Sequence, residues 1–83
     1  MMQQGLVGDC MIPKWITDKV KDIATEESVD YFIRENNEFS FTIGVWRISD
    51  GMKFGDNCIF TWEDVENDPT IIATVVRAMA EEL

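Results

Sequence analysis

Residues 27–48, ESVDYFIRENNEFSFTIGVWRI, contain two runs in which apolar and polar residues alternate, and these runs indicate the fold class. Val29, Tyr31 and Ile33 occupy every second position, and the same period of two runs through FSFTIGV at 39–45. Aromatic and β-branched residues with this period are typical of β-strands. The inner face of the second strand is expected to carry Phe39, Phe41, Ile43 and Val45. The stretch therefore predicts two neighbouring strands.

The segment ENNE at 35–38 is expected to join these strands as a hairpin turn. Asn tolerates the left-handed backbone that a tight turn needs, and two Asn residues stand in the middle of the segment. One alternative stays open for residues 26–36, because Val29, Phe32 and Ile33 also fit the spacing of a helix. The alternation favours a strand.

A third strand is expected within MKFGDNCIFTW at 52–62. It follows a turn centred on Asp50 and Gly51, a pair typical of two-residue hairpin connections. Gly55 is expected to interrupt this strand with a bulge or a second bend, because glycine weakens strand interiors.

A first helix is predicted over residues 13–25, because Pro13 suits the first helical position and an apolar stripe follows it. The stripe consists of Trp15, Ile16, Val20, Ile23 and Ala24. The segment contains Lys and Asp residues at the remaining positions, as on the solvent side of an amphipathic helix.

A last helix is predicted from Asp68 to the end of the chain, with Asp68 as N-cap and Pro69 in the first position. Its apolar stripe consists of Ile72, Val75, Val76, Met79 and Leu83. Ahead of it, Thr61 and Asp64 resemble a capping box and predict a single helical turn at 62–66.

These elements predict one α+β domain over residues 13–83, in the order helix, three-stranded antiparallel meander, helix (αβββα). Both helices are expected to pack on the same face of the sheet, which gives two layers. Residues 1–12 are expected to form an N-terminal extension, either flexible or paired as an edge strand. A chain of 83 residues buries roughly 60–65% of its unfolded surface, enough for one core.

The chain has 16 acidic and 7 basic residues, a net charge of −9. The whole excess lies from Glu26 onward, where 13 acids stand against four bases. Such a surface repels phosphate backbones and anionic lipids. We therefore expect no direct binding to nucleic acid or membrane, and a protein partner with a basic surface fits better.

Residues that would support catalysis or cofactor binding are scarce. The chain has no histidine, which excludes His-based catalysis and nearly every zinc site. The acidic run EDVEND does not have the calcium-loop spacing, and GLVG at 5–8 matches no phosphate-binding loop. We predict no enzymatic activity, no metal and no cofactor.

The two cysteines, Cys10 and Cys58, are too few for a disulfide framework, and whether they bond to each other stays open. The N-terminus lacks the pattern of a secretory signal, and no apolar stretch approaches the roughly 20 residues of a membrane span. A reduced, cytoplasmic protein is expected.

TWEDVENDPT at 61–70 concentrates four carboxylates without a positive charge. Helix capping accounts for Asp68 and Asp64, because carboxylates are favoured at helix N-termini. A second interpretation is that the run imitates the phosphates of a nucleic acid. The residues assigned to this acidic partner-binding surface are Glu63, Asp64, Glu66, Asp68, Glu35 and Glu38, with Glu26, Glu27 and Asp30 as further members.

Trp46 falls in phase with Ser40, Thr42 and Gly44, on the face opposite the inner side of the strand. There it would be either an interface anchor, since Trp and Arg dominate binding hot spots, or part of a core covered from that side. Both interpretations stay open.

The chain is similar in length and acidity, though in no motif, to small viral and plasmid inhibitors of host nucleases. The leading hypothesis is a small acidic protein-binding domain, in its most specific form a phage or mobile-element inhibitor of anti-CRISPR-like character. Such a DNA mimic would occupy the basic nucleic-acid-binding surface of a host defence protein. The alternative is an adaptor or subunit of a larger assembly, or a homodimer, that uses Trp46 and apolar helix flanks, with acidity serving solubility only.

Overall fold

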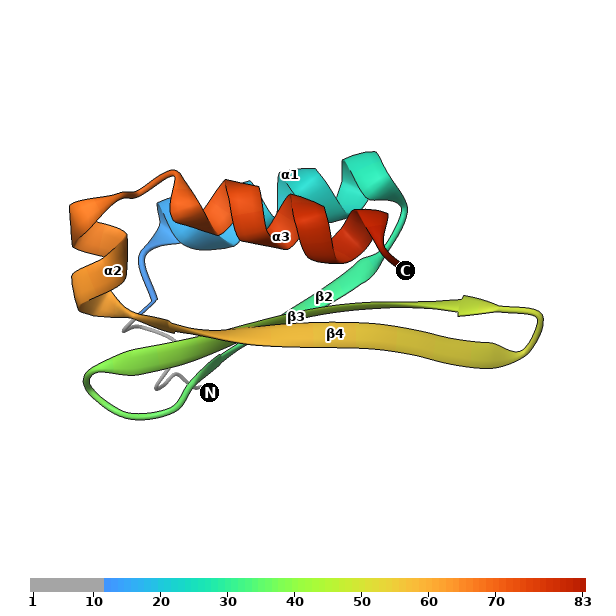
Figure 1. Cartoon of the computed structure of the whole chain (residues 1–83), viewed down its shortest axis with the longest axis horizontal. Coiled ribbons are helices and arrows are strands. Elements are labelled where there is room, and N and C mark those ends of the chain that lie inside the picture. The colour runs from blue at the N-terminus through green and yellow to red at the C-terminus, as the bar shows by residue number, and fades with distance from the viewer. Residues whose placement is uncertain (1–11) are drawn as a thin grey trace.

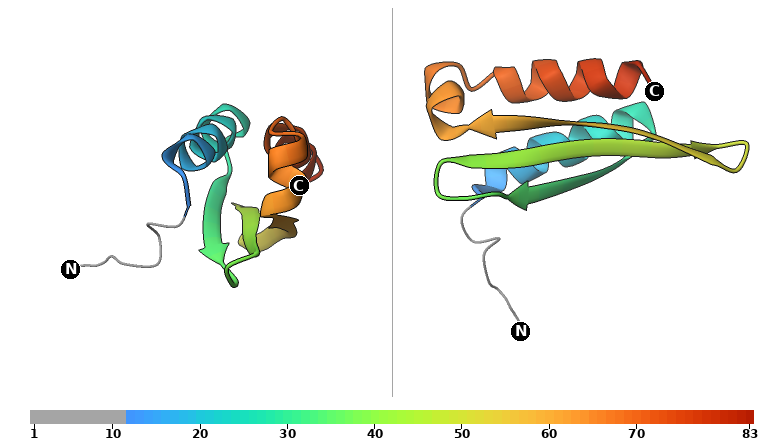
Figure 2. Two further views of the ribbon diagram at one scale, coloured as in Figure 1. Left: turned by 90° about the vertical axis from the view of Figure 1, so that its left-hand side faces the viewer. Right: turned by 60° about the horizontal axis from the view of Figure 1, so that its bottom comes forward.

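A computed structural model describes residues 12–83 and has the predicted α+β order, with two helices after the sheet (Figure 1). The elements are α1 Lys14–Glu27, β2 Asp30–Glu35, β3 Ser40–Ser49, β4 Met52–Thr61, α2 Trp62–Asn67 and α3 Ile71–Glu81. Helices α1 and α3 lie side by side over one face of the sheet, as two viewing directions show (Figure 2). The two-layer αβββα prediction is confirmed. Of the predicted extension at 1–12, residues 1–11, with Cys10, lie outside the described residues, and Ile12 packs against the core.

The core forms where α1 and α3 cover the middle of the sheet. The strands are antiparallel in the order β2-β3-β4. The helix-facing residues of β3 are Phe41, Ile43 and Val45, all buried. The helices contribute Ile16, Val20, Ile23, Ile72, Val76 and Met79. The buried residues of both predicted apolar stripes therefore form the core with the sheet. Trp15, assigned to the first stripe, is 46% exposed, so its predicted place on the apolar side of the helix is wrong. Among residues 12–83, no helix has the length and apolar run that crossing a membrane requires.

Helix α1 begins one residue later and ends two residues later than predicted. Pro13 is the N-cap, and its carbonyl accepts a hydrogen bond from the Ile16 N–H at 3.1 Å. Ser28 ends the helix in the left-handed region, with φ 59°, and the Val29 N–H donates to the Ala24 carbonyl at 2.9 Å. The strand interpretation of the following residues is confirmed, since β2 starts at Asp30.

The turn between β2 and β3 differs from the prediction in two respects. Neither Asn has a positive φ; instead the side-chain oxygen of Asn37 accepts hydrogen bonds from the N–H groups of Phe39 (2.8 Å) and Ser40 (3.0 Å). Such Asx bonds stabilise a turn without left-handed backbone. They also hold Phe39 in the turn, ahead of the strand, so its ring is 70% exposed and the predicted inward position is wrong.

The hairpin between β3 and β4 has the predicted two-residue turn at Asp50 and Gly51, both with positive φ (55° and 78°). This is the conformation that suits the twist of a hairpin. The predicted bulge at Gly55 is wrong, because the pairing continues without a break from Ser49↔Met52 to Ser40↔Thr61. A Cβ at Gly55 would lie 3.1 Å from the Cβ of Trp46, the residue paired with Gly55 on the neighbouring strand β3. The glycine therefore allows close approach to Trp46.

Helix α2 begins as predicted. The Thr61 hydroxyl oxygen accepts a hydrogen bond from the Asp64 N–H at 3.1 Å. Helix α3 begins at Ile71, later than predicted, with Thr70 as N-cap. Asp68 instead ends α2, and its carboxylate accepts hydrogen bonds from the N–H (3.2 Å) and hydroxyl (2.6 Å) of Thr70. The carboxylate thus stabilises the link between the helices rather than capping α3.

Replacing Thr61 with alanine is expected to lower the free energy of unfolding by about 1 kcal/mol, because the Asp64 N–H would lose its N-cap partner. Urea unfolding followed by circular dichroism measures the loss. Thr61→Ser, which keeps the hydroxyl, should recover most of it. Thr74→Ala, at an exposed position of α3, is the matched control and should not destabilise. Equal losses in both alanine variants would contradict a capping role for Thr61.

Candidate protein-interaction surfaces

The first candidate surface, which we name the acidic end, lies where α2 meets the turn between β2 and β3 (Figure 1). The Trp62 N–H donates to the Phe39 carbonyl at 3.0 Å, which ties the first residue of α2 to this turn. The exposed carboxylates of the acidic end are those of Glu38, Glu63, Asp64, Glu66 and Asp68. The structure thus brings the turn that contains Glu38 to the start of α2, more than twenty positions later in the sequence.

None of the carboxylates of the acidic end forms an ion pair among residues 12–83. The two ion pairs in this part of the chain join Lys14 to Asp18 (2.9 Å) and Arg77 to Glu26 (2.8 Å), both on the helices α1 and α3. Within the same residues, the one carboxylate of the acidic end that accepts hydrogen bonds is that of Asp68. The other four carboxylates are available to a partner.

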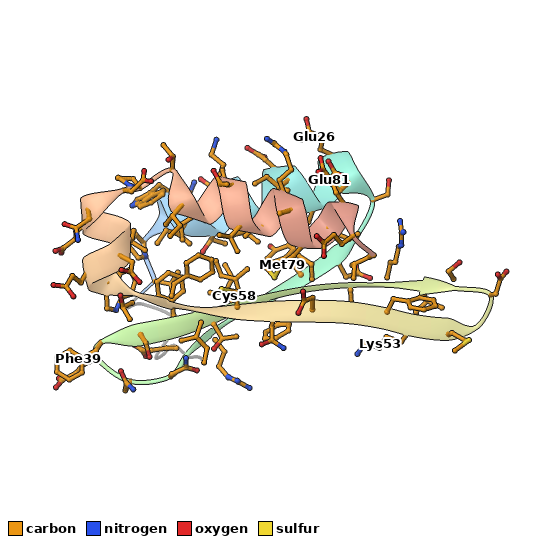
Figure 3. The ribbon with its side chains drawn as sticks, viewed as in Figure 1. Glu26, Phe39, Lys53, Cys58, Met79 and Glu81 are labelled. Atoms are coloured by element: carbon orange, nitrogen blue, oxygen red, sulfur yellow. The ribbon has the colours of Figure 1, made fainter. Side chains whose placement is uncertain are left out.

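The remaining predicted acids are not all at this end. Glu35 is the last residue of β2, on the strand end that leads into the turn, but it is half-buried and faces the helix side with Phe41. Glu26 is bound to Arg77 and, like Glu81, lies on the helix layer away from α2 (Figure 3). The acidic surface is therefore smaller than the sequence suggests.

The second candidate surface is the open face, the side of the sheet that the helices do not cover (Figure 2). It is defined by alternate residues of the three strands: Asp30, Phe32 and Arg34; Thr42, Gly44, Trp46 and Ile48; Lys53, Gly55, Asn57 and Ile59. Three large apolar residues of this face are exposed: Phe32 by 37%, Ile48 by 69% and Ile59 by 66%.

The middle of the open face is a small aromatic cluster. The Phe32 ring lies over Gly44, so that a Cβ at this glycine would overlap the ring. Its centroid is 6.2 Å from that of Trp46, and the Lys53 ammonium is 5.1 Å from the Trp46 centroid. Both distances are typical of aromatic and cation–π contacts. The glycine and the lysine together hold the two rings in place.

Trp46 lies on the open face and not in the core, as its alternation with the inner residues predicts, and it is half-buried by its neighbours. It is separate from the acidic end, since five residues of β3 lie between Ser40, at the end of the strand near the turn, and Trp46. Phe32, Ile48 and Ile59 were not predicted to belong to this surface. The signal that identifies them is the strand register, which places their side chains on the same face as Trp46.

The hairpin of β3 and β4 extends past the helix layer (Figure 1). On the side of the hairpin that faces the helices, Met52 is 62% and Phe54 43% exposed. The base of the hairpin is fixed, because the Arg47 guanidinium donates to the carbonyl of Leu83. The projecting hairpin thus presents apolar side chains on both of its faces.

Among residues 12–83, no three Cys, Asp or Glu side chains gather as they would around a metal ion. We assign no cofactor to this part of the chain. Comparisons of the chain with protein-family models, curated proteins and solved structures find no match.

Proposed function

We propose that this chain is a non-enzymatic protein-binding domain whose acidic end occupies a basic surface of another protein. The supporting observation is the group of exposed carboxylates at the acidic end, none of which forms an ion pair among residues 12–83. In α2 and its C-cap, four carboxylates lie between positions 63 and 68. At about 1.5 Å per residue this is roughly one charge per 2 Å, close to the one charge per about 1.7 Å of duplex DNA.

The partner that fits such charge density is a protein that normally binds a nucleic acid through Lys and Arg side chains. In the most specific form of the proposal, the chain is an inhibitor from a phage or other mobile element. It would act in the cytoplasm on a nucleic-acid-binding defence protein of the host. Occupation of the basic surface would exclude the nucleic acid by competition, and no chemistry at the acidic end is needed.

A second candidate function is supported by the open face. Large exposed apolar side chains that gather on one face are a mark of interaction sites, and Trp is over-represented among binding hot spots. The open face combines Trp46 with exposed Phe32, Ile48 and Ile59. In this case the chain would be a subunit or adaptor, and its acidity would only aid solubility.

A capture experiment from a lysate of the native host distinguishes the two functions. If the acidic end binds a basic partner, the affinity for the captured protein should fall at least about tenfold as salt is raised, because screening weakens exposed charge pairs. The variant E63K/D64K/E66K should bind at least about tenfold less well at low salt. Surface plasmon resonance with the purified partner gives both values.

The matched control is D22K/E81K/E82K, which reverses three exposed carboxylates of the helices and changes the net charge equally. It should retain most of the affinity, and urea unfolding should show that both variants are folded. If both variants lost affinity equally, the loss would come from the change in net charge. That result would contradict specific binding through the acidic end. An affinity that does not depend on salt concentration but is lost in Trp46→Ala would instead favour the adaptor function.

A further inference from the structure

We infer that the open face binds the open face of a second copy of this chain, forming a symmetric dimer with two sheets between two helix layers. This inference rests on the second candidate function, that the open face is an interface, and it names the occupant. Three properties of the face carry it: its charge, its register and its size.

The open face is the part of the sheet where a second copy meets least repulsion. Two copies with a net charge of −9 each repel one another over most of their surfaces. Among the residues that define the open face, Asp30 is the single acid, and Arg34 and Lys53 are basic. The central strand β3 contributes only apolar and neutral residues to the face, and the charged ones belong to the outer strands β2 and β4.

The register of the strands makes this face complementary to itself. In two sheets related by a two-fold axis along β3, each β3 lies over its counterpart, and β2 of one copy lies over β4 of the other. Asp30, Trp46 and Gly55 form one row across the sheet. Asp30 of one copy therefore lies opposite Gly55 of the other copy. Lys53 of that other copy lies two positions from Gly55 on β4.

This arrangement pairs the one acid of the face with a base of the second copy. Lys53 lies about 6.6 Å along its strand from the level of Asp30 of the other copy, and packed sheets are about 10 Å apart. The long Lys side chain can span this separation. The same symmetry brings Trp46 and Ile48 over the same residues of the other copy. Aromatic and aliphatic side chains would then form the centre of the interface, with charge pairs at its margins.

The area of the face suits a dimer of modest affinity. Strands β3 and β4 have ten residues each, so the face is about 33 Å long at about 3.3 Å per residue. Strand β2 has six residues, so the three strands, about 4.8 Å apart, give roughly 400 Å² on each copy. The total of roughly 800 Å² is below the standard size of specific interfaces and in the range of weak, transient ones. We therefore expect dissociation in the micromolar range.

Sedimentation equilibrium of the full chain in reducing buffer, over about 1–200 μM, tests the dimer. The unmodified chain should shift from monomer to dimer with concentration. Ile48→Lys places two lysines against each other across the axis and should weaken the dimer at least tenfold. Met52→Lys is the matched control, since Met52 is equally exposed near the same hairpin turn but faces the other side. It should dimerise like the unmodified chain.

A charge exchange tests the register. Asp30→Lys and Lys53→Asp should each weaken the dimer several-fold, and the double variant D30K/K53D should restore it, because the pair reforms with its signs exchanged. A chain that stays monomeric over the whole concentration range would overturn the inference. So would equal weakening by Ile48→Lys and Met52→Lys, or a double variant weaker than either single one. Salt-sensitive binding through the acidic end would be unaffected by these outcomes.

Discussion

Replacing Phe41 with alanine is expected to lower the free energy of unfolding by about 3–5 kcal/mol, the usual cost of truncating a fully buried Phe. Phe41 has no exposed surface, and its ring lies between those of Phe60 and Trp62, with centroid distances of 5.5 and 4.5 Å. These contacts join β3 to β4 and to the start of α2. A domain of 83 residues has roughly 4–12 kcal/mol of stability in all, so the variant should be partly or wholly unfolded at room temperature.

Phe39→Ala is the matched control for this prediction. Phe39 lies two positions earlier, has the same side chain and belongs to the same alternating pattern, but its ring is 70% exposed. Its loss should cost well under 1 kcal/mol. Urea unfolding of both variants, followed by circular dichroism, compares them directly. A loss of similar size in the two variants would mean that Phe39 packs into the core.

Replacing Gly44 with valine should destabilise the protein by about 1–3 kcal/mol, because the Phe32 ring occupies the space of the new side chain and must move. The destabilising effect of Gly44→Val should disappear or reverse once the Phe32 ring is removed. In a Phe32→Ala background, Gly44→Val should be neutral or stabilising by up to about 1 kcal/mol, because β-branched residues are favoured in strands and glycine is not.

Urea unfolding of the four proteins of this double-mutant cycle measures the coupling between positions 32 and 44, which should reach about 2 kcal/mol or more. Gly51→Ala is a useful comparison, since Gly51 has no heavy atom near its missing Cβ and its cost comes from a φ of 78°. Its loss should therefore persist in the Phe32→Ala background. A Gly44→Val cost that is the same in both backgrounds would show that the ring of Phe32 does not lie over Gly44.

The acidic end and the open face were predictable to different degrees. The acids at 63–68 are contiguous in the sequence, so their clustering follows from a short helix alone. Glu38 joins them because Trp62 is hydrogen-bonded to the turn that contains it, a contact between distant segments. Trp46 was identified from its phase in one strand, whereas Ile59 required the pairing of β4 with β3.

The order of the elements, the two-residue turn at Asp50 and Gly51, and the cap that Thr61 provides to α2 could be predicted from local patterns. Each depends on residues within a few positions of one another, where alternation and turn chemistry act directly. The exposure of Phe39 also has a local cause, the hydrogen bonds to Asn37, which the alternating pattern does not reveal. The structure was needed to show that β4 runs past Gly55 without a bulge and which side chains share the open face. Those outcomes depend on the register between strands, and a shift of one residue would reverse the face of every side chain. Register is fixed by the summed packing of distant segments, which no local pattern contains.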